Sequence, residues 1–269
     1  MDMYGPVAPP ARGGFPYVLQ LVDDCTHVRA VYTLRHKDEA AEAVKPFIIA
    51  WVLPRGDQIQ GLRGDNAAEF KGSSMRYVMR FIGGIQLEYS APYRNWQLGV
   101  VEPGWRTLAD KTRAVLAAAL QYWPYAMKYV CWLTNRLPTR VTLRGCAVTL
   151  VQALNPDTAP LGLLTLRPWG CPNYVHVNDK TGRNHALQAN AEVDYYLRLT
   201  GSNRTHTVLL KETGAVMKAA FGSCTFNEIA PLTAVRIRGS CLLSFPAVPP
   251  AVPTTADVKS DRSRGFEPS

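Results

Sequence analysis

Two short apolar segments near the start of the chain, followed by a segment with helical spacing, limit the folds open to this sequence. Residues 17–22 and 28–34 are β-prone runs separated by a polar turn, which predicts two adjacent strands. Residues 38–53 carry apolar side chains at helical spacing. A third short apolar strand, 59–62, leads into Asp65. Because strands come first and helices are interleaved after them, we predict an α/β layer fold.

The rest of the chain continues this mixed pattern and then changes character. Residues 73–82 predict a second helix, and residues 105–133 predict a long helical segment interrupted near Pro124. Residues 172–228 contain short β-prone runs separated by turn residues, which is typical of a small β-barrel; the runs are 173–177, 193–199, 206–210 and 223–226. From Pro231 onward the chain is rich in Pro, Ser and Thr, which predicts a disordered tail.

Composition indicates the kind of partner. The chain has 30 Lys and Arg against 21 Asp and Glu, a net charge of +9. Such an excess favours an anionic partner, because Lys and Arg release counterions from phosphates without reading sequence. The six cysteines form no Cys-x-x-Cys pair, which predicts reduced thiols in an intracellular protein. No apolar run is long enough to span a bilayer, so we expect no membrane partner.

Two carboxylates stand in distinctive local contexts. Asp65 lies within the segment LRGDNAAEF, where an apolar strand passes into a loop, and Glu102 ends the segment GVVE. Sites in α/β sheets favour such strand ends. Mg²⁺ prefers oxygen ligands, and two such ions stabilise the attacking and leaving oxygens of phosphoryl transfer. The alternative is that Asp65 is a turn residue, since Asp and Asn favour turns.

Further motifs follow in order along the chain. They read MDMYGP at 1–6, LVDDCT at 21–26, VYTL at 31–34, NRLPT at 135–139, LRPWGC at 166–171 and FNE at 226–228. Together with the two carboxylate segments, these motifs resemble the integrase core of Ty1/copia-type retrotransposon polyproteins, in the retroviral-integrase superfamily, and the small domain that follows that core. The likeness runs from Asp2 to about Ile229.

The resemblance implies both a fold and a function. It implies an RNase H-like core, a mixed sheet flanked by helices, over residues 1–160, then an SH3-like β domain over 166–229 and a disordered tail over 230–269. The implied activity is polynucleotidyl transfer in DNA integration. DNA is then the expected partner, self-association is expected because related integrases work as multimers, and a functional protein would act in the nucleus.

The resemblance also implies the site residues. The catalytic and metal-ligating positions map to Asp2, Asp65 and Glu102, with Mg²⁺ or Mn²⁺ as the cofactor. The acidic pair Asp23-Asp24 stays open as the source of the first ligand in place of Asp2. Neighbouring strand residues point to opposite faces, so at most one member of that pair could face the site.

Basic residues around the long helical segment are the candidate contacts to DNA phosphates. They are Arg94, Arg106, Lys111 and Arg113. The alternative for the last three is a solvated helix face. We expect the tryptophans of this region to lie in the core rather than to stack on bases; they are Trp105, Trp123 and Trp132.

Three departures from the family's pattern argue against activity in the chain as it stands. Only Met1 precedes Asp2, so we expect that carboxylate to fray. Pro103 disfavours helical backbone at Glu102, so the helix is expected to begin after Glu102 or to kink there. In the loop at 95–98, Trp96 and Leu98 stand where the family has polar residues that could meet DNA. Separately, Ala67 replaces a family glycine and would be strained if its φ were positive. These departures predict a truncated, diverged and inactive copy that binds DNA or protein, as the alternative to an active integrase.

Overall fold

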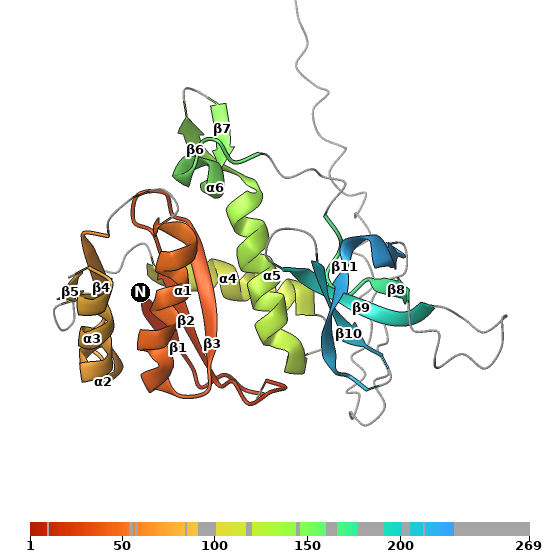
Figure 1. The fold of residues 1–269 in the computed structure, drawn as a ribbon, viewed down its shortest axis with the longest axis horizontal. Coiled ribbons are helices and arrows are strands. Elements are labelled where there is room, and N and C mark those ends of the chain that lie inside the picture. The colour runs from red at the N-terminus through yellow and green to blue at the C-terminus, as the bar shows by residue number, and fades with distance from the viewer. Residues whose placement is uncertain are drawn as a thin grey trace, which may run out of the picture.

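The computed structural model describes most of the chain up to residue 228. The described residues are 1–9, 11–53, 56, 59–83, 85–90, 101–116, 120–143, 146–159, 166–176, 191–200, 205–211 and 213–228. They form a mixture of helices and strands (Figure 1), as predicted for an α/β protein. Within these ranges, no helix is both long and apolar enough to cross a membrane.

The N-terminal strands form a three-stranded antiparallel sheet in the order β1-β2-β3. Its strands are β1 (Asp2–Tyr4), β2 (Tyr17–Val22) and β3 (Arg29–Leu34). The two predicted apolar strands are therefore confirmed, with the second starting one residue later than predicted. The strand that follows, β4 (Gly61–Gly64), pairs in parallel with β5 (Gln86–Tyr89). The prediction had placed this strand two residues earlier.

Helices cover both faces of the first sheet. Leu19 and Leu21 of β2 belong to one buried cluster with α1 (Ala40–Trp51), which a 3-10 turn (Lys37–Glu39) precedes. Val18, on the opposite face of the same strand, belongs to a second cluster with the later helices. Alternation of side chains along β2 therefore gives each helical layer its own apolar surface.

Two short helices lie between β4 and β5, and two longer helices follow. They are α2 (Ala68–Lys71), α3 (Ser73–Phe81), α4 (Val101–Leu116) and α5 (Trp123–Arg136). The second predicted helix corresponds to α3, whereas α2 was not predicted. The long helical segment is interrupted near Pro124, as predicted, because a 3-10 turn (Leu120–Tyr122) directly precedes α5. Pro124 itself lies in the first turn of α5, where a missing N–H costs no intrahelical bond.

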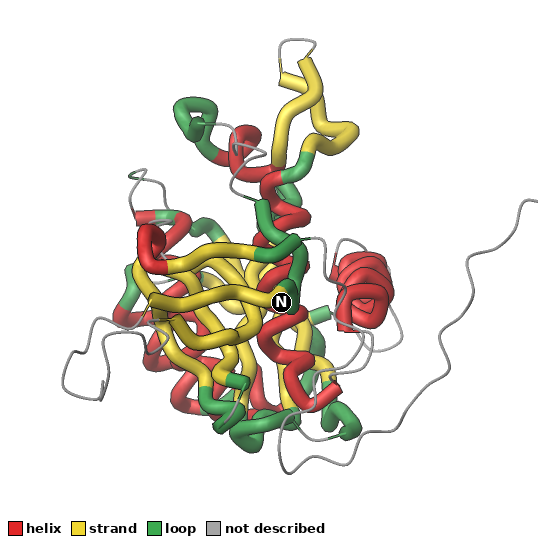
Figure 2. Tube along the Cα trace, turned by 90° about the vertical axis from the view of Figure 1, so that its right-hand side faces the viewer, coloured by secondary structure: helices red, strands yellow, loops and turns green. Residues whose placement is uncertain are grey.

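A hairpin and a short helix follow α5. The hairpin pairs β6 (Pro138–Leu143) with β7 (Cys146–Thr149), and Figure 2 shows it projecting away from the other elements. Helix α6 (Leu150–Leu154) begins directly after it. The Thr149 hydroxyl accepts a hydrogen bond from the Gln152 backbone N–H, and the Gln152 side chain accepts one from the Thr149 N–H, each 3.1 Å long. This capping box fixes the start of α6.

The C-terminal part of the described chain is a five-stranded antiparallel sheet in the order β11-β10-β9-β8-β12. Its strands are β8 (Pro172–His176), β9 (Ala191–Thr200), β10 (Thr205–Leu210), β11 (Val216–Ala220) and β12 (Cys224–Phe226), with a 3-10 turn (Phe221–Ser223) before the last. Four of these strands match predicted runs, and β11 was not predicted. The sheet agrees with a small β domain, and its SH3-like class stays a prediction.

Helix α5 joins the two sheets through one apolar core. Figure 1 shows it between the strands β1–β3 and the strands β8–β11. The ring of Tyr129 on α5 meets Tyr196 of β9 edge-on, with centroids 6.3 Å apart, and both belong to the cluster that includes Val18.

The division of the chain at 160–166 stays a prediction, and the predicted tail, 230–269, lies outside the described residues.

Candidate functional site

Asp2 is held by the strand that it begins. β1 pairs with β2 so that Asp2 lies opposite Gln20, and the Met1 amino group donates a 2.6 Å hydrogen bond to the backbone carbonyl of Arg63 in β4. These bonds place β1 between β2 and β4. The expectation that Asp2 frays is therefore wrong in this structure, because Met1 ahead of it bonds to β4 and Asp2 itself pairs with β2.

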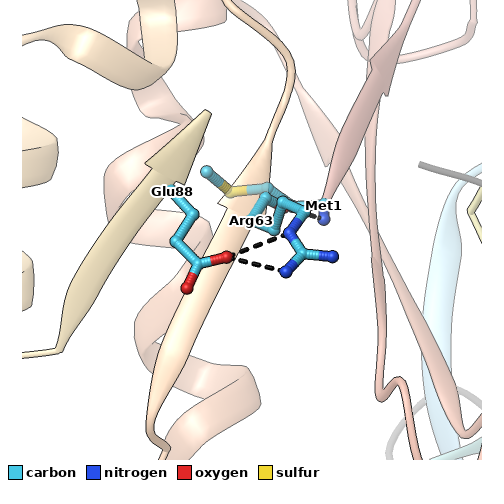
Figure 3. Close-up of polar contacts among 3 residues, drawn as sticks. All are labelled: Met1, Arg63 and Glu88. Carbon is cyan, nitrogen blue, oxygen red and sulfur yellow. Dashed lines mark hydrogen bonds and ion pairs between the residues drawn. The ribbon is translucent and has the colours of Figure 1, made fainter. Parts of the chain in front are cut away.

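Asp65 directly follows β4, as predicted. The Ala67 N–H donates a 3.3 Å hydrogen bond to Asp65 Oδ1, which turns the chain into α2. Ala67 itself has φ −68°, so the loop needs no left-handed residue and the replacement of glycine carries no strain. Arg63, two residues before Asp65, pairs with Glu88 on β5: its guanidinium donates two hydrogen bonds, of 3.0 and 2.8 Å, to one oxygen of the Glu88 carboxylate (Figure 3).

Asp2 and Asp65 influence each other electrostatically although they lie far apart in sequence. Burial raises the pKa of Asp2, and the nearby negative charge of Asp65 raises it further. The Met3 N–H, 2.8 Å from Asp2 Oδ1, acts in the opposite direction. A carboxylate whose ionised form is disfavoured by a neighbouring carboxylate gains from a bound cation.

The amino group of Met1 lies in the same surroundings. Burial lowers its pKa to about 6, while the charges of Asp2 and Asp65 act in the opposite sense. Asp24 contributes a weaker effect of the same sign, so its carboxylate is also within electrostatic reach of this amino group. Burial therefore disfavours the charged form of this amine beside the two carboxylates.

The first turn of α4 lies beside Asp2. The Trp105 ring packs 5.5 Å from the Tyr4 ring of β1, and its indole lowers the pKa of Asp2. The indole Nε1 is buried and forms no hydrogen bond within the described structure, so the effect of Trp105 on the pKa of Asp2 reflects the proximity of the two side chains. Glu102 lies one turn before Trp105, so its backbone belongs to the segment next to Asp2.

Pro103 does not displace the start of α4. The helix runs from Val101 to Leu116 and includes Glu102, so the expectation of a start after Glu102 is wrong. Pro103 is the third helical residue, and its missing N–H is one of the four that no intrahelical carbonyl would accept. The Glu102 side chain lies outside the described part of the structure, and among the described side chains no three acidic, His or Cys residues gather at one point.

The acidic pair on the β2–β3 turn has a different role. Asp23 Oδ2 accepts hydrogen bonds from the backbone N–H and the hydroxyl of Thr26, at 2.8 and 2.6 Å. These bonds close the turn and occupy the carboxylate. Asp24 is exposed on the same turn. The geometry therefore favours Asp2 over Asp23 as the first carboxylate of the site.

Sequence reasoning missed a set of buried polar groups beside Asp2. Gln20 is fully buried, and neither side-chain polar atom makes a hydrogen bond within the described structure. Nε of Arg29 likewise makes no hydrogen bond within the described structure, and burial lowers the pKa of this guanidinium. Gly104 of α4 packs so closely that a Cβ there would lie 3.2 Å from Gln20 Nε2. Buried polar groups of this kind need partners, and bound water is the simplest one. The available signal was a lone Gln inside an apolar strand.

The predicted nucleic-acid contacts fall into two groups. Arg94 lies outside the described residues, whereas the three on α4 are exposed: Arg106, Lys111 and Arg113. Arg113 is paired with Asp110 one turn away, and Lys111 Nζ lies 3.4 Å from the Thr134 hydroxyl of α5. Their exposure fits both predictions, contact with phosphates and a solvated helix face.

The tryptophans and cysteines behave largely as expected. Trp123 is buried in the core and Trp105 packs against it, while Trp132 lies between Tyr129 and the guanidinium of Arg136. The four cysteines with described side chains are all unpaired thiols; they are Cys25, Cys131, Cys171 and Cys224.

Three other motifs that carry the family resemblance, NRLPT, LRPWGC and FNE, make contacts that hold the structure together. Asn135 of the NRLPT motif donates to the Arg29 carbonyl at 2.6 Å and accepts from its N–H at 3.2 Å, which joins α5 to β3. Arg167 of LRPWGC pairs with Glu228 of the FNE segment at 3.1 Å and covers the ring of Phe226. Motifs about sixty residues apart thus meet in the β domain.

Comparison with known proteins gives one sequence relative of note. Over 141 residues, 51% of this chain, the sequence is 28% identical to the retrovirus-related Pol polyprotein from transposon TNT 1-94 of Nicotiana tabacum. The match covers 10% of that polyprotein. The chain is similar to a region of a retrotransposon Pol polyprotein. No protein-family model matches the sequence.

One solved structure to which this chain is similar is that of the simian T-cell lymphotropic virus intasome in complex with PP2A regulatory subunit B56 gamma. The superposition covers 80% of this chain and 73% of the other, with 14% sequence identity and a TM-score of 0.44.

Proposed function

We propose that this chain is an integrase-type domain of a retrotransposon Pol polyprotein, acting on DNA as a polynucleotidyl transferase. The observation that carries the proposal is that Asp2, at the start of β1, lies within electrostatic reach of Asp65, directly after β4, and beside Trp105 of α4, the helix that carries Glu102. The similarity to a plant transposon polyprotein supports it. DNA binding, self-association and action in the nucleus belong to the same proposal.

The arrangement of elements supports an RNase H-like core. The Met1–Arg63 hydrogen bond places β1 next to β4, so the antiparallel and parallel pairs lie side by side. Helix α1 packs on one face of β2, and α4 and α5 lie toward the other. A mixed sheet with helices on both faces is what the sequence resemblance implies for that core.

The donor set fits a hard divalent cation. Asp2 and Asp65 offer carboxylate oxygens, the ligands that Mg²⁺ and Mn²⁺ prefer, and the effect of Asp65 on the pKa of Asp2 is the repulsion that a cation would relieve. Asp2, Asp65 and Glu102 would hold such ions. When bound, they would polarise a phosphodiester and its attacking oxygen. The chain itself contributes the placement of the carboxylates through β1, β4 and α4.

Binding without catalysis is the second candidate. The exposed side chains of Arg106 and Lys111 favour it, because neither forms an ion pair within the described structure and both can meet phosphates without a metal site. Such binding needs no aligned carboxylates.

Metal-dependent strand transfer on model DNA ends separates the two candidates. We expect the chain to join or cleave DNA with Mg²⁺ or Mn²⁺, and Asp65→Asn and Asp2→Asn each to lose on the order of a hundredfold or more, because displaced ligands are costly at such sites. Asp24→Asn, a charge-matched change on the exposed turn, should retain activity. Salt-dependent DNA binding without activity in the unaltered chain would leave the binding function alone.

A further inference from the structure

A pair of cationic side chains lies where the first sheet, α5 and the C-terminal sheet meet. Lys128 of α5 donates a 3.0 Å hydrogen bond from Nζ to the hydroxyl of Thr33 in β3. Arg198 of β9 lies within electrostatic reach of Tyr125 on the same helix. The edge-on contact of Tyr196 with Tyr129 shows that β9 packs on α5, and the charge of Arg198, two residues beyond Tyr196, acts on Lys128, one residue before Tyr129.

Neither cation has an acidic partner in the described structure. Ion pairs there involve other residues, and Arg198 Nε is buried without any hydrogen bond. Burial of Lys128, reinforced by the like charge of Arg198, lowers its pKa to about 8. Burial also lowers the pKa of Arg198. Partly buried charges are ordinarily paired, so two nearby cations without an acidic partner in the described structure are unfavourable until an anion joins them.

We propose that Lys128 and Arg198, with the hydroxyls of Thr33 and Tyr125, form an anion site for a phosphate group. The pairing of a guanidinium with an ammonium suits a phosphate, because the guanidinium offers a planar array of N–H donors and the ammonium a point charge. The anion would bridge β3, α5 and β9, and so fix the first sheet relative to the C-terminal sheet. This site is separate from the carboxylates and does not rest on the proposed function.

Two sources supply the same chemistry, a free phosphate and a phosphate of a nucleic-acid backbone. The experiment therefore measures thermal unfolding of the full chain with inorganic phosphate, with a short single-stranded oligonucleotide, and with chloride at matched ionic strength. A ligand that binds only the folded state raises Tm, and millimolar phosphate should raise it by about 2–4 °C above chloride. An effect of the oligonucleotide alone would assign the site to a backbone phosphate.

Replacement of Lys128 should change Tm in a direction that replacement of a purely structural lysine would not. Without phosphate, Lys128→Met should keep or raise Tm, because it removes repulsion from Arg198 and leaves an apolar stem in place. The phosphate effect should disappear. Lys111→Met is the matched control, since Lys111 also contacts a threonine hydroxyl of another element but is exposed. That variant should keep the phosphate effect.

Labelling of lysines by an amine reagent at pH 8 gives a second readout that does not depend on stability. Lys128 should be among the more reactive lysines, and phosphate should slow its modification several-fold by restoring the protonated form. Arg198→Met should abolish this protection. No protection and no Tm rise beyond that in chloride would overturn the site, as would a phosphate effect that persists in both Lys128→Met and Arg198→Met.

Discussion

Gly64 sets how closely β1 approaches β4, and its replacement by Ala tests whether this packing holds the two candidate carboxylates together. A Cβ at position 64 would lie 3.0 Å from Cε of Met1, 3.3 Å from Cγ of Met1 and 3.4 Å from Cδ2 of Phe70. Both neighbours are buried. The backbone of Gly64 is not left-handed, so any effect comes from the added methyl group.

Overpacking should outweigh the gain that Ala brings by restricting the unfolded chain. An added methyl in a packed interior costs about 1–3 kcal/mol, whereas Gly→Ala at a compatible site gains about 0.4–1 kcal/mol. The net loss of about 1–2 kcal/mol should lower Tm by roughly 2–8 °C. Because Met1 is the nearer neighbour, relief of the contact moves β1 and shifts Asp2 away from Asp65. The neighbours need to give by only a few tenths of an ångström, so Mn²⁺ binding should weaken without being lost.

The assay combines urea unfolding with Mn²⁺ binding followed by electron paramagnetic resonance. Gly72→Ala is the matched control, because its Cβ would meet nothing nearer than the Glu69 carbonyl at 3.9 Å and its φ of −59° suits Ala. That control should be neutral or slightly stabilised. Phe70→Leu in the Gly64→Ala background should cost less than it does alone, since it makes room for the methyl group. Equal stability and Mn²⁺ affinity of Gly64→Ala and Gly72→Ala would refute the reasoning.

Three further predictions concern charge and pH. Burial lowers the pKa of His206 from 6.5 to about 4, so the unfolded chain takes up that proton first and stability falls as the pH drops through this window, by about 3 kcal/mol at most. Acid titration of unfolding should show this fall reduced in His206→Phe but not in the exposed control His176→Phe. Asp23→Ala should lose about 1 kcal/mol by opening the β2–β3 turn, and Asp24→Ala should lose almost nothing, as measured by urea unfolding. Arg106→Ala should reduce the salt slope of duplex DNA binding by about 1, and an unchanged slope would remove that residue from the interface.

Elements with strong local patterns were predictable from the sequence. β2, β3 and α1 carry period-two or helical apolar spacing, and the structure reproduces them to within two residues. Asp65 at a strand end followed from the apolar run before it. By contrast, α2 is a single turn and β11 is half exposed, so neither has the apolar period that would reveal it.

The errors concerned contacts between distant segments. The sequence around Asp2 suggests a loose end, but the hydrogen bond from Met1 to Arg63 comes from residues more than sixty positions apart. Pro103 looks like a helix breaker until its position within α4 is known, because the same residue is tolerated in the first turn and costly later. Gln20 is marked in the sequence only as a lone polar residue in an apolar strand, and Lys128 by nothing, since their importance depends on which elements pack against them.

The candidate carboxylate site and the proposed anion site share a physical logic. Each gathers like charges from elements far apart in the chain: Asp2 and Asp65 from β1 and the end of β4, Lys128 and Arg198 from α5 and β9. Like charges near each other in a partly buried place oppose folding, because each raises the free energy of the other's charged form. A fold that tolerates this twice gains from ions of opposite sign supplied from outside, a divalent cation at one site and a phosphate at the other. Nucleic acid with its metal ions carries both, which ties the anion site to the same chemistry as the carboxylates even though the two sites can be tested apart.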